Sequence, residues 1–549
     1  MSDMRRDPLV IVLLLASAAL GCAGLGDGGS FRSEPGMARG IVFDDADRDG
    51  ERSPGERGVE GVRVSNGRHV AVSDRLGRYE LPLVDREDTI VFVIKPSGWA
   101  PPVDEQGLSR FYYIHKPAGS PPALEHPGVA PTGALPPSID FALHRQAEPE
   151  RFRVLVLADP QPYSAEQLDF FARDILPELA GSDAAFGVSL GDLVGDDLAL
   201  FEPLNAAMGL LGIPWYNVLG NHDINYDASD DRGSDESFER VYGPATYAFA
   251  YSGVHFIVLD NVVYDPGSEA EGRGPGYAGG ISPEQLQFVH GYLATLPADR
   301  RVVLLMHIPL VGEGGHQLPA VQREALFAVL AGHPHTLSFS GHTHLQAQHF
   351  LGAEAGNSGA PHHHLNLATA SGSWWRGLPD ELGIPHTTMR DGTPNGYAVA
   401  TFEGLDYAVR FKAARRPADY QMNVYAPARV RAADARNTEV LVNVFAGSER
   451  SRVELRLTGA PETAKAGAAS WIRLEQVERP DPAYAALWKR ELDLLGEERA
   501  SLPGPVPSTH LWSGHLPGDP APGSYWIEVR STDLFDQVDT GRRLIRVDP

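Results

Sequence analysis

Five apolar runs in the middle of the chain each end beside residues that can bind a metal ion, and this repeated ending restricts the fold more than any other feature. The runs are rich in β-branched and aromatic residues, so each is predicted as a strand. Ligands collect at the carboxyl ends of strands in layered α/β folds, so we expect the side chains that follow the runs to meet. The runs span residues 152–158, 184–190, 214–219, 301–306 and 335–340.

The side chains that follow these runs are carboxylates, amides and imidazoles. Such donors suit hard or borderline divalent ions such as Mn, Fe or Zn, and the single cysteine of the chain excludes a cysteine-based zinc site. One ion uses about four to six ligands, so seven candidates indicate two ions, with Asp192 suited to bridge them. Gly191, Gly220 and Gly341 allow sharp turns beside the ions. The candidates are Asp159, Gln161, Asp192, Asn221, His307, His342 and His344.

The ordered motifs resemble those of the calcineurin-like metallophosphoesterase family, whose pattern is Asp-x-His, Gly-Asp, Gly-Asn-His-Asp/Glu, a lone His and Gly-His-x-His. The resemblance covers residues 151–345. It implies two metal ions that share Asp192. The implied ligands are Asp159, Asp192 and His344 for the first ion, and Asp192, Asn221, His307 and His342 for the second.

The resemblance also gives roles to residues beside the ligands. His222 resembles the family's histidine beside the substrate phosphate, and Asp223 resembles its orienting partner. Gln161 stands where the commoner pattern has histidine. Its amide oxygen either binds a hard cation more weakly or only holds a water molecule, so the resemblance does not define which metal the first site takes.

The function implied is metal-dependent hydrolysis of a phosphomonoester or phosphodiester by attack of metal-bound hydroxide. His222 would protonate the leaving oxygen or stabilise charge on the phosphate. The same metal shell serves both ester types and does not separate them. The expected substrate is a phosphorylated small molecule or a fragment of the cell envelope. The alternative is a cell-surface binding or adhesion protein with a relic hydrolase domain, but none of the expected ligands except the histidine at 161 is missing.

The overall charge narrows the range of partners. The chain has 47 Lys and Arg against 72 Asp and Glu, a net charge of −25. That surplus repels phosphate backbones, so general nucleic-acid binding is not expected. A phosphorylated substrate needs a local positive centre, which two divalent ions would provide.

The chain is too long for one domain, and its texture changes along its length. Residues 40–95 show short β-rich runs between Gly and Asp turns, which predict a β-sandwich. Residues 96–150 are dense in Pro and Gly and predict a connector. Residues 151–411 predict an α/β catalytic domain with central sheets flanked by helices, and residues 412–549 predict a β-rich domain. The flanking segments resemble the accessory domains of a bacterial subgroup of these phosphoesterases.

Three helices are predicted in the catalytic segment. The first presents apolar residues at helical spacing between Leu168 and Leu179. The second begins at a capping box formed by Ser282 and Gln285, with a proline in its first turn. The third covers residues 319–331 and ends before a glycine.

The first residues predict export. Arg5 and Arg6 precede the uncharged, mostly apolar residues 9–20, a run too short to span a bilayer. Residues 1–21 therefore resemble a cleaved signal peptide, and residues 22–39 a flexible tether. The lone cysteine, Cys22, follows a sequence that resembles a bacterial lipobox, which implies a lipid anchor in the cell envelope as the only membrane contact. A plain secretory signal with an incidental cysteine is the alternative.

Several other residues have two interpretations. The three histidines at 362–364 lie in a Gly/Pro-rich stretch, so a solvated loop is favoured over a further metal site. Trp374 and Trp375 either wall a substrate pocket or close the core. His255 and His316 are predicted to be structural or surface residues.

An acidic loop near the N-terminus predicts a second kind of metal site. Oxygen donors at its first, third, fifth and twelfth positions, with Gly50 at the sixth, match a calcium-binding loop. Residues 41–43 predict a strand before the loop, and Pro54 excludes a regular helix after it. We expect a structural calcium ion between strands; the alternative is a solvated acidic turn. The donors are Asp45, Asp47, Asp49 and Glu56.

Overall fold

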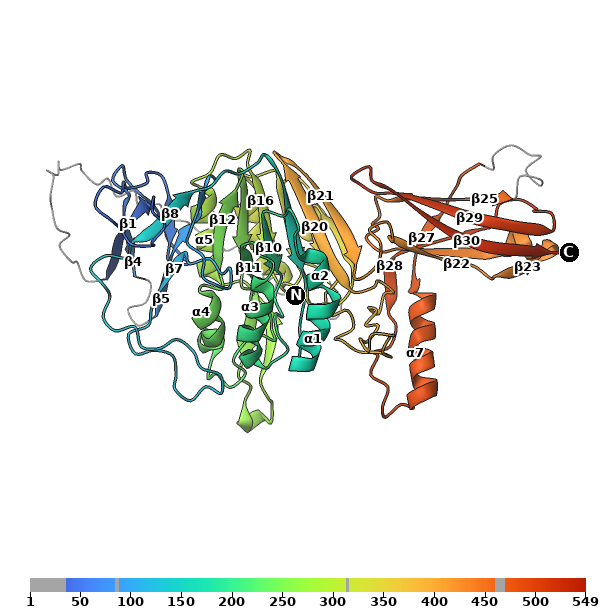
Figure 1. Ribbon diagram of the computed structural model, residues 1–549, viewed down its shortest axis with the longest axis horizontal. Coiled ribbons are helices and arrows are strands. Elements are labelled where there is room, and N and C mark those ends of the chain that lie inside the picture. Colours follow the sequence, from blue (N-terminus) through green and yellow to red (C-terminus); the bar gives the residue numbers. More distant parts are fainter. Residues whose placement is uncertain (1–35, 84–87, 313–314, 460–469) are drawn as a thin grey trace, which may run out of the picture. The chain divides into compact units, whose positions relative to one another are not determined.

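The computed structural model describes residues 36–83, 88–312, 315–459 and 470–549 (Figure 1). The predicted signal peptide and Cys22 lie outside these residues. Among the helices of the described ranges, none is both long and apolar enough to cross a membrane.

The N-terminal segment consists of two four-stranded sheets, with strand orders β4-β1-β8-β6 and β3-β2-β5-β7. Apolar side chains of both sheets, such as Val42 and Phe92, belong to one buried core. The strands are β1 (Met37–Asp44), β2 (Arg63–Ser65), β3 (Val70–Val72), β4 (Arg78–Pro82), β5 (Thr89–Ile94), β6 (Trp99–Ala100), β7 (Tyr112–His115) and β8 (Phe141–Arg145).

Residues 96–150, predicted as a connector, instead supply three of these strands. β7 pairs with β5, and β8 runs parallel to β1 with Phe141 opposite Val42. The prolines of this segment all lie outside its strands. Proline lacks the backbone N–H that donates hydrogen bonds between strands. Because these prolines lie outside the strands, they do not prevent the strands from pairing.

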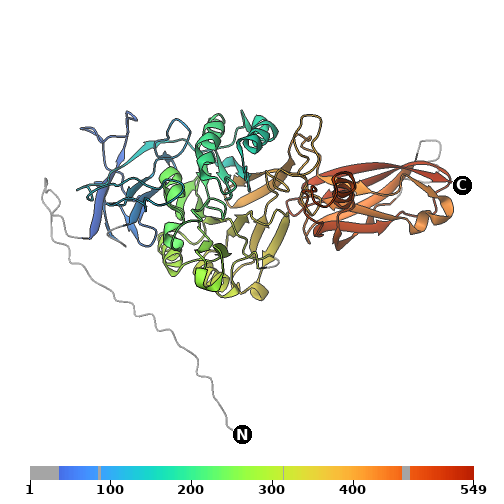
Figure 2. The same ribbon diagram turned by 90° about the horizontal axis from the view of Figure 1, so that it is seen from below.

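The central segment is built in four layers, with two sheets between two sets of helices (Figures 1 and 2). One sheet has the order β11-β10-β9-β20-β21 and the other β12-β13-β16-β17-β19-β18. The strands are β9 (Arg151–Leu157), β10 (Phe186–Ser189), β11 (Trp215–Asn217), β12 (Tyr247–Tyr251), β13 (Val254–Val258), β16 (Arg301–Leu305), β17 (Thr336–Ser340), β18 (Ala347–Leu351), β19 (His362–Asn366), β20 (Gly396–Glu403) and β21 (Asp406–Ala413). A separate hairpin pairs β14 (Val262–Asp265) with β15 (Gly276–Gly279).

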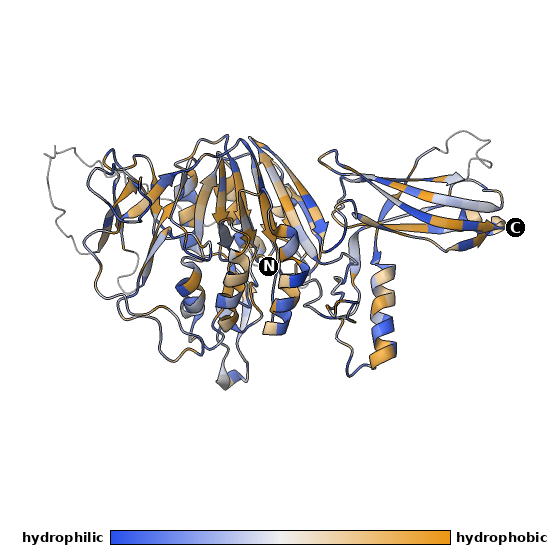
Figure 3. Ribbon diagram, viewed as in Figure 1, coloured by the Kyte–Doolittle hydropathy of each residue, from blue (hydrophilic) through white to orange (hydrophobic). Residues whose placement is uncertain are grey.

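Alternation along β9 explains the layering. Leu155 and Leu157 share a core with the helices of one side, whereas Val154 and Val156 share a core with the second sheet. A strand buried on both faces carries apolar residues throughout, and Figure 3 shows this hydrophobic colouring on the central strands. The helices are α1 (Ala165–Asp174), α2 (Leu176–Leu179), α3 (Phe201–Gly209), α4 (Glu236–Tyr242), α5 (Pro283–Leu293) and α6 (Ala320–Leu330).

The strands and helices predicted for the central segment are present in the structure. The five apolar runs become β9, β10, β11, β16 and β17. The first predicted helix is divided into α1 and α2 at Ile175, and α5 begins at the predicted capping box, with Ser282 and Gln285 bonded reciprocally. In addition, β20 pairs antiparallel with β9 from far along the chain, with Val399 opposite Leu155.

The three histidines at 362–364 do not form a solvated loop, and that prediction is wrong. They belong to β19, which lies buried between β17 and β18. The Gly/Pro-rich residues before them, 356–361, form only the turn that leads into the strand. Ser and Thr side chains of β17 provide hydrogen-bond partners that allow histidine to be buried there.

The C-terminal segment has two sheets, β22-β24-β28-β27 and β23-β30-β29-β25-β26, around one apolar core. It also contains α7 (Pro482–Leu495), a helix that the sequence interpretation did not include. The strands are β22 (Met422–Tyr425), β23 (Arg429–Arg431), β24 (Glu439–Val444), β25 (Arg452–Gly459), β26 (Ile472–Arg473), β27 (Glu475–Pro480), β28 (Pro507–His515), β29 (Gly523–Thr532) and β30 (Val538–Asp548).

Candidate metal centre

The predicted ligands follow the carboxyl ends of parallel strands in both central sheets. Asp159, His307 and His342 each lie two residues beyond the end of β9, β16 and β17. Asp192 follows β10, and Asn221 lies in the loop after β11. All of these side chains are buried. The two sheets therefore bring together residues that are far apart in the sequence.

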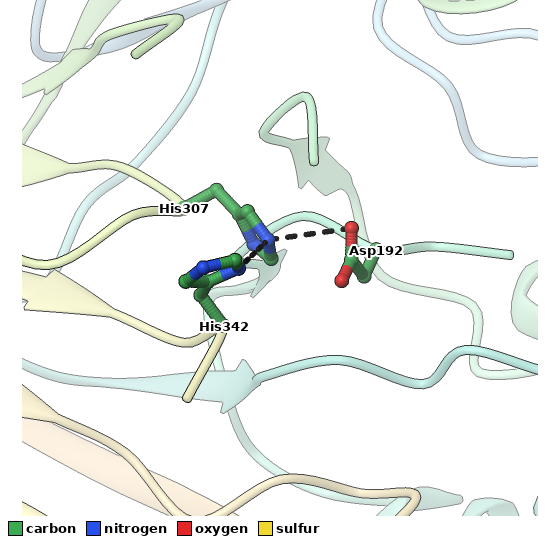
Figure 4. Close-up of side chains that lie close together, drawn as sticks. All are labelled: Asp192, His307 and His342. Atoms are coloured by element: carbon green, nitrogen blue, oxygen red, sulfur yellow. Dashed lines mark hydrogen bonds and ion pairs between the residues drawn. The ribbon is translucent and has the colours of Figure 1, made fainter. Parts of the chain in front are cut away.

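Three of these side chains form one tight group. Asp192, His307 and His342 offer ligand atoms that all lie within 4.8 Å of one another, and Figure 4 shows the side chains turned together. His307 Nε2 lies 3.3 Å from Asp192 Oδ1, 3.0 Å from Asn221 Oδ1 and 3.1 Å from His342 Nδ1. Two imidazole nitrogens and two oxygens converging on one buried place form the donor set of a divalent cation.

Asp159 and His344 form a second group, and Gln161 lines the same cavity as His344. His344 Nε2 lies 3.6 Å from Asp159 Oδ1. His344 Nδ1 donates a hydrogen bond to the carbonyl oxygen of Gly372, which leaves Nε2 as the acceptor nitrogen. Gln161 Nε2 is engaged with Tyr163 Oη at 3.0 Å, which leaves its Oε1 free.

Unsatisfied buried atoms test whether this donor set fits metal ions. His344 Nε2 and Gln161 Oε1 are both buried without a hydrogen-bond partner among the described residues. Such atoms are rare in folded proteins unless an ion or water satisfies them. Both atoms are lone-pair donors, so the residues present fit a cation at the first site. A role of Gln161 Oε1 as a direct ligand stays a prediction.

The electrostatics of the centre also fit cations. Burial raises the pKa of Asp159 to about 8, against the attraction of His307. Burial acts in the same direction on Asp192, but His307 and His222 hold the pKa of that carboxyl well below its usual range. Burial lowers the pKa of His344 to about 3 and so keeps its ring neutral, the form that binds metals. Bound divalent cations would stabilise the ionised form of Asp159 beside the negative charge of Asp192.

The backbone around the centre is strained. Asp159, Gln161, Asp192, His342 and His344 all have positive φ angles, between 43° and 74°. Non-glycine residues rarely adopt this conformation, and it concentrates at functional sites.

Two motif glycines show why the strained loops can approach so closely. A Cβ atom on Gly220 would lie 1.9 Å from the backbone nitrogen of Asp192, and one on Gly341 would lie 2.1 Å from Asp159 Oδ2. Any side chain at either position would displace a predicted ligand.

His222 lies beside the metal groups, partly exposed. Its backbone N–H donates to Asp192 Oδ1 at 2.9 Å, and its Nδ1 lies 2.6 Å from Asp196 Oδ1. Burial acts to lower the pKa of His222, but Asp192 and Asp196 raise it to about 9. The histidine is therefore held in its protonated form in the absence of metal.

The orienting partner of His222 is Asp196 and not Asp223, which corrects the sequence interpretation. The carboxylate of Asp223 accepts hydrogen bonds from the backbone N–H groups of Leu193, Val194 and Gly220 at 2.8–3.1 Å. Asp223 thus fixes the two loops that carry Asp192 and Asn221. Although Asp223 is adjacent to His222 in the sequence, its carboxylate makes no hydrogen bond to the His222 ring in the described structure.

A cavity of about 510 Å³ opens beside the centre and is lined by His222, Asp192 and His342, among others. Trp374 lines it and stacks on His344, with ring centroids 4.0 Å apart. Trp375 is buried in the core, where its Nε1 donates to the carbonyl oxygen of Pro160. The tryptophan pair is therefore divided between the two roles considered for it.

His316 was predicted from the sequence to be a structural or surface residue, and Tyr163 and Asp196 were not singled out. His316 lines the same cavity, with Nδ1 3.1 Å from His342 Nε2, so it is placed to fix the orientation of that ring. No local pattern marks His316. His255, in contrast, is a structural residue, buried with Nδ1 2.8 Å from Tyr292 Oη.

Comparisons with known proteins agree with this geometry. Residues 152–346 match the family model described as calcineurin-like phosphoesterase. Residues 46–125 match the model for the N terminal of calcineurin-like phosphoesterase, and residues 364–538 match the model for its C terminal. Together the three matches span most of the chain. No match was found among curated proteins.

Two solved structures are similar to this chain. One is purple acid phosphatase PPD1 from yellow lupin (Lupinus luteus) seeds, with 12% identity and a TM-score of 0.33 over 69% of this chain and 67% of that one. The other is GAP50, the anchor in the inner membrane complex of Plasmodium, with 14% identity and a TM-score of 0.28 over 48% of this chain and 85% of that one.

The three family matches cover the segment with the ligands and both segments beside it. The motifs that follow β9, β10, β11, β16 and β17 lie within the central match, and three of their side chains, Asp192, His307 and His342, converge on one place. The chain belongs to the calcineurin-like phosphoesterase family and is a metal-dependent phosphoric ester hydrolase with a dinuclear metal centre.

Proposed function

We propose that this chain is an exported phosphoesterase that hydrolyses a small phosphomonoester or phosphodiester in the cell envelope. The observation that supports this most is the pair of unsatisfied donors, His344 Nε2 and Gln161 Oε1, beside the buried group of Asp192, His307 and His342. Members of both groups, His344 of one and Asp192 and His342 of the other, line the cavity together with Gln161 and His222. A phosphate there would lie between positive charge and a proton donor.

The chain's own residues have distinct tasks in this reaction. Asp159, Gln161 and His344 would hold one ion, and Asp192, Asn221, His307 and His342 the other, with Asp192 shared. When bound, the two divalent ions neutralise the phosphate and make a water molecule more acidic. Asp196 fixes Nδ1 of His222 and so leaves Nε2 to donate its proton to the leaving oxygen.

The metals that we propose rest on donor chemistry. Carboxylate, amide and imidazole donors without thiolate favour Mn, Fe or Zn. The amide oxygen of Gln161 favours a harder ion in the first site than histidine would. Metal analysis of the purified protein tests this, and two equivalents of bound metal are expected.

An activity assay tests the reaction class. The metal-free protein is reloaded with Mn, Fe, Zn or Mg and assayed with p-nitrophenyl phosphate and bis(p-nitrophenyl) phosphate. Hydrolysis of at least one ester that depends on added metal supports the proposal. Absence of turnover with every metal on both esters contradicts it.

Export and anchoring rest on the sequence of residues 1–22. A short apolar run after Arg5 and Arg6, followed by Cys22 as the only thiol, supports a lipid-modified exported protein. Cys22→Ala should move the protein from the membrane fraction to the soluble exported fraction. Unchanged fractionation with an intact leader would contradict lipidation and favour a plain signal peptide.

We further propose that the acidic loop after β1 binds a structural calcium ion. Asp45, Asp47 and Asp49 offer carboxylate oxygens within 4.8 Å of one another. Asp45 is 1% exposed, and its Oδ1 has no hydrogen-bond partner among the described residues, while Oδ2 accepts from the N–H of Gly50. A buried carboxylate oxygen without a donor suits a hard cation.

Glu56 has a different place from the one predicted. Its two carboxylate oxygens accept hydrogen bonds from the backbone N–H groups of Ala46 and Ser53, both at 2.9 Å. It therefore holds the loop closed and is not part of the group of three aspartates.

Calorimetric titration of the metal-loaded full chain with calcium tests the loop. A dissociation constant of ~10⁻⁴–10⁻³ M, typical of extracellular modules, is expected. Asp47→Ala should abolish the heat, and Glu51→Ala, an exposed acidic residue of the same loop, should not. Equal binding by wild type and Asp47→Ala would identify the loop as an ordinary turn.

A further inference from the structure

The cavity beside the metal centre extends to residues outside the motif-bearing strands. Arg390, Asp391, Val506 and the first residues of β28, Pro507 and Thr509, line it together with His222 and several of the ligands. The C-terminal segment therefore supplies part of the wall of the cavity.

A buried hydrogen-bond network fixes this part of the wall. His510 of β28 is fully buried, with Nε2 3.2 Å from Asp391 Oδ2 and Nδ1 2.7 Å from Asn443 Oδ1. Asn443 Nδ2 also donates to the carbonyl oxygen of Asp391 at 3.0 Å. Because Asp391 is held from two strands of the C-terminal segment, its neighbour Arg390 is held as well.

Arg390 is the one lysine or arginine among the described residues that line this cavity. Its Nε is buried without a hydrogen-bond partner, and the described residues give its side chain neither a hydrogen bond nor an ion pair. Among the described residues Arg390 and the adjacent carboxylate of Asp391 form no ion pair, and the Asp391 oxygens instead accept from the N–H groups of Gln346 and Thr393 and lie against His510.

A guanidinium group binds carboxylate or phosphate through paired, charge-assisted hydrogen bonds. The metal centre already accounts for the phosphate that is cleaved, so Arg390 is available to a second anionic group. A cavity of 510 Å³ is within the ~300–1,000 Å³ range of small-molecule sites and can hold both groups of one substrate.

We propose that Arg390 forms an anion subsite, and that the preferred substrate is a small organic phosphate ester with a second negatively charged group. This rests on the proposed phosphoesterase function. The second group, a carboxylate or a further phosphate, binds Arg390 while the scissile phosphate occupies the metal centre. The C-terminal segment thereby takes part in substrate selection.

Matched phosphonates test the subsite, because they are not hydrolysed. Phosphonoacetate, 3-phosphonopropionate and 4-phosphonobutyrate are each compared, as inhibitors of p-nitrophenyl ester hydrolysis, with the alkylphosphonate of equal length. At least one carboxylated member should inhibit the metal-loaded wild type about tenfold more strongly than its partner. Arg390→Gln should remove that difference and leave alkylphosphonate inhibition within about twofold.

Arg376→Gln is the matched control, since Arg376 is exposed and near Trp374 but does not line the cavity. Equal inhibition within every pair in the wild type, or the same loss in Arg376→Gln, overturns the subsite. If Arg390→Gln melts early, Arg390→Lys provides the comparison and should retain part of the preference. If the wild type hydrolyses neither ester, the proposed function fails, and calorimetry with the same phosphonate pairs still decides whether Arg390 binds the second charge.

Discussion

Two groups of buried histidines belong to the six-stranded sheet and to the loops that follow its strands, and their partners differ. In β19, both ring nitrogens of His362 lie 2.8 Å from hydroxyl oxygens, those of Thr336 and Ser338. The ring nitrogens of His363 and His364 are likewise matched by hydroxyl, amide or backbone groups. At the metal centre, His307 and His342 face each other, and His344 Nε2 faces no donor.

This difference teaches that burial of histidine does not distinguish structure from function, but its partners do. A histidine whose two nitrogens are both satisfied by neutral groups contributes to the core. One whose lone pair faces other lone pairs or a carboxylate needs a cation. Substitutions at the metal centre should therefore reduce activity or metal content, and a substitution in β19 should reduce stability.

Asp192→Asn should have the largest effect. The change keeps the shape of the side chain but removes the negative charge that both predicted metal sites share. Turnover should fall below about one thousandth of wild type, together with the metal content. Activity assays and metal analysis on the same preparation measure this, and retention of both ions would exclude a bridging role.

His222→Ala should abolish most activity without loss of metal. The side chain lies beside the donors and is held by Asp196, not by the ligand group. A loss of roughly 10²–10⁴ in kcat is expected if it transfers a proton. Loss of metal in equal measure would show that His222 belongs to the shell.

Asp196→Asn should have a smaller effect, about tenfold in kcat. The neutral amide no longer raises the pKa of His222, so the alkaline limb of the kcat profile should shift to lower pH, with metal content unchanged. Asp223→Asn provides the contrast, because it weakens three backbone hydrogen bonds and should lower stability. An unchanged profile for Asp196→Asn would return the orienting role to another group.

His362→Gln should leave kcat within about twofold and reduce stability by ~1–3 kcal/mol at pH 8. Burial lowers the pKa of His362 to about 3, from about 6.5 in the unfolded chain. The unfolded state therefore takes up the proton first, and the wild type loses stability as pH falls below about 6.5.

Glutamine does not titrate, so the difference in stability between the two proteins should shrink by ~1–2 kcal/mol between pH 8 and pH 5. Chemical denaturation at both pH values measures this. A constant difference would mean that His362 is not buried in its neutral form.

The ligand positions could be predicted from sequence because the constraint is local. Each ligand motif directly follows an apolar strand, and glycines such as Gly220 mark the places where the backbone must pass close to a ligand. The positions of the five strands along the chain and the helix start at Ser282 are likewise determined by neighbouring residues.

The contacts that could not be predicted are those between segments that lie far apart in the sequence. His362 is buried because β19 pairs with β17, which places Ser338 beside it; the Gly/Pro residues before it indicated only a loop. The sequence interpretation named only Asp223 as the partner of His222, whereas the folded loops place Asp196 against its ring and Asp223 against backbone N–H groups. The contribution of Arg390 to the cavity depends on β28, more than a hundred residues later.

The pairing of β20 with β9 sets the order in which the enzyme can be assembled. Every predicted ligand is present by His344, yet β9, which positions Asp159, acquires its second neighbour only when residues 396–403 join the sheet. A closure of this length forms slowly and late. A growing chain that already contains all the ligands would still lack the β20–β9 pairing that holds β9 in place. Metal binding should therefore follow synthesis of the chain through β20.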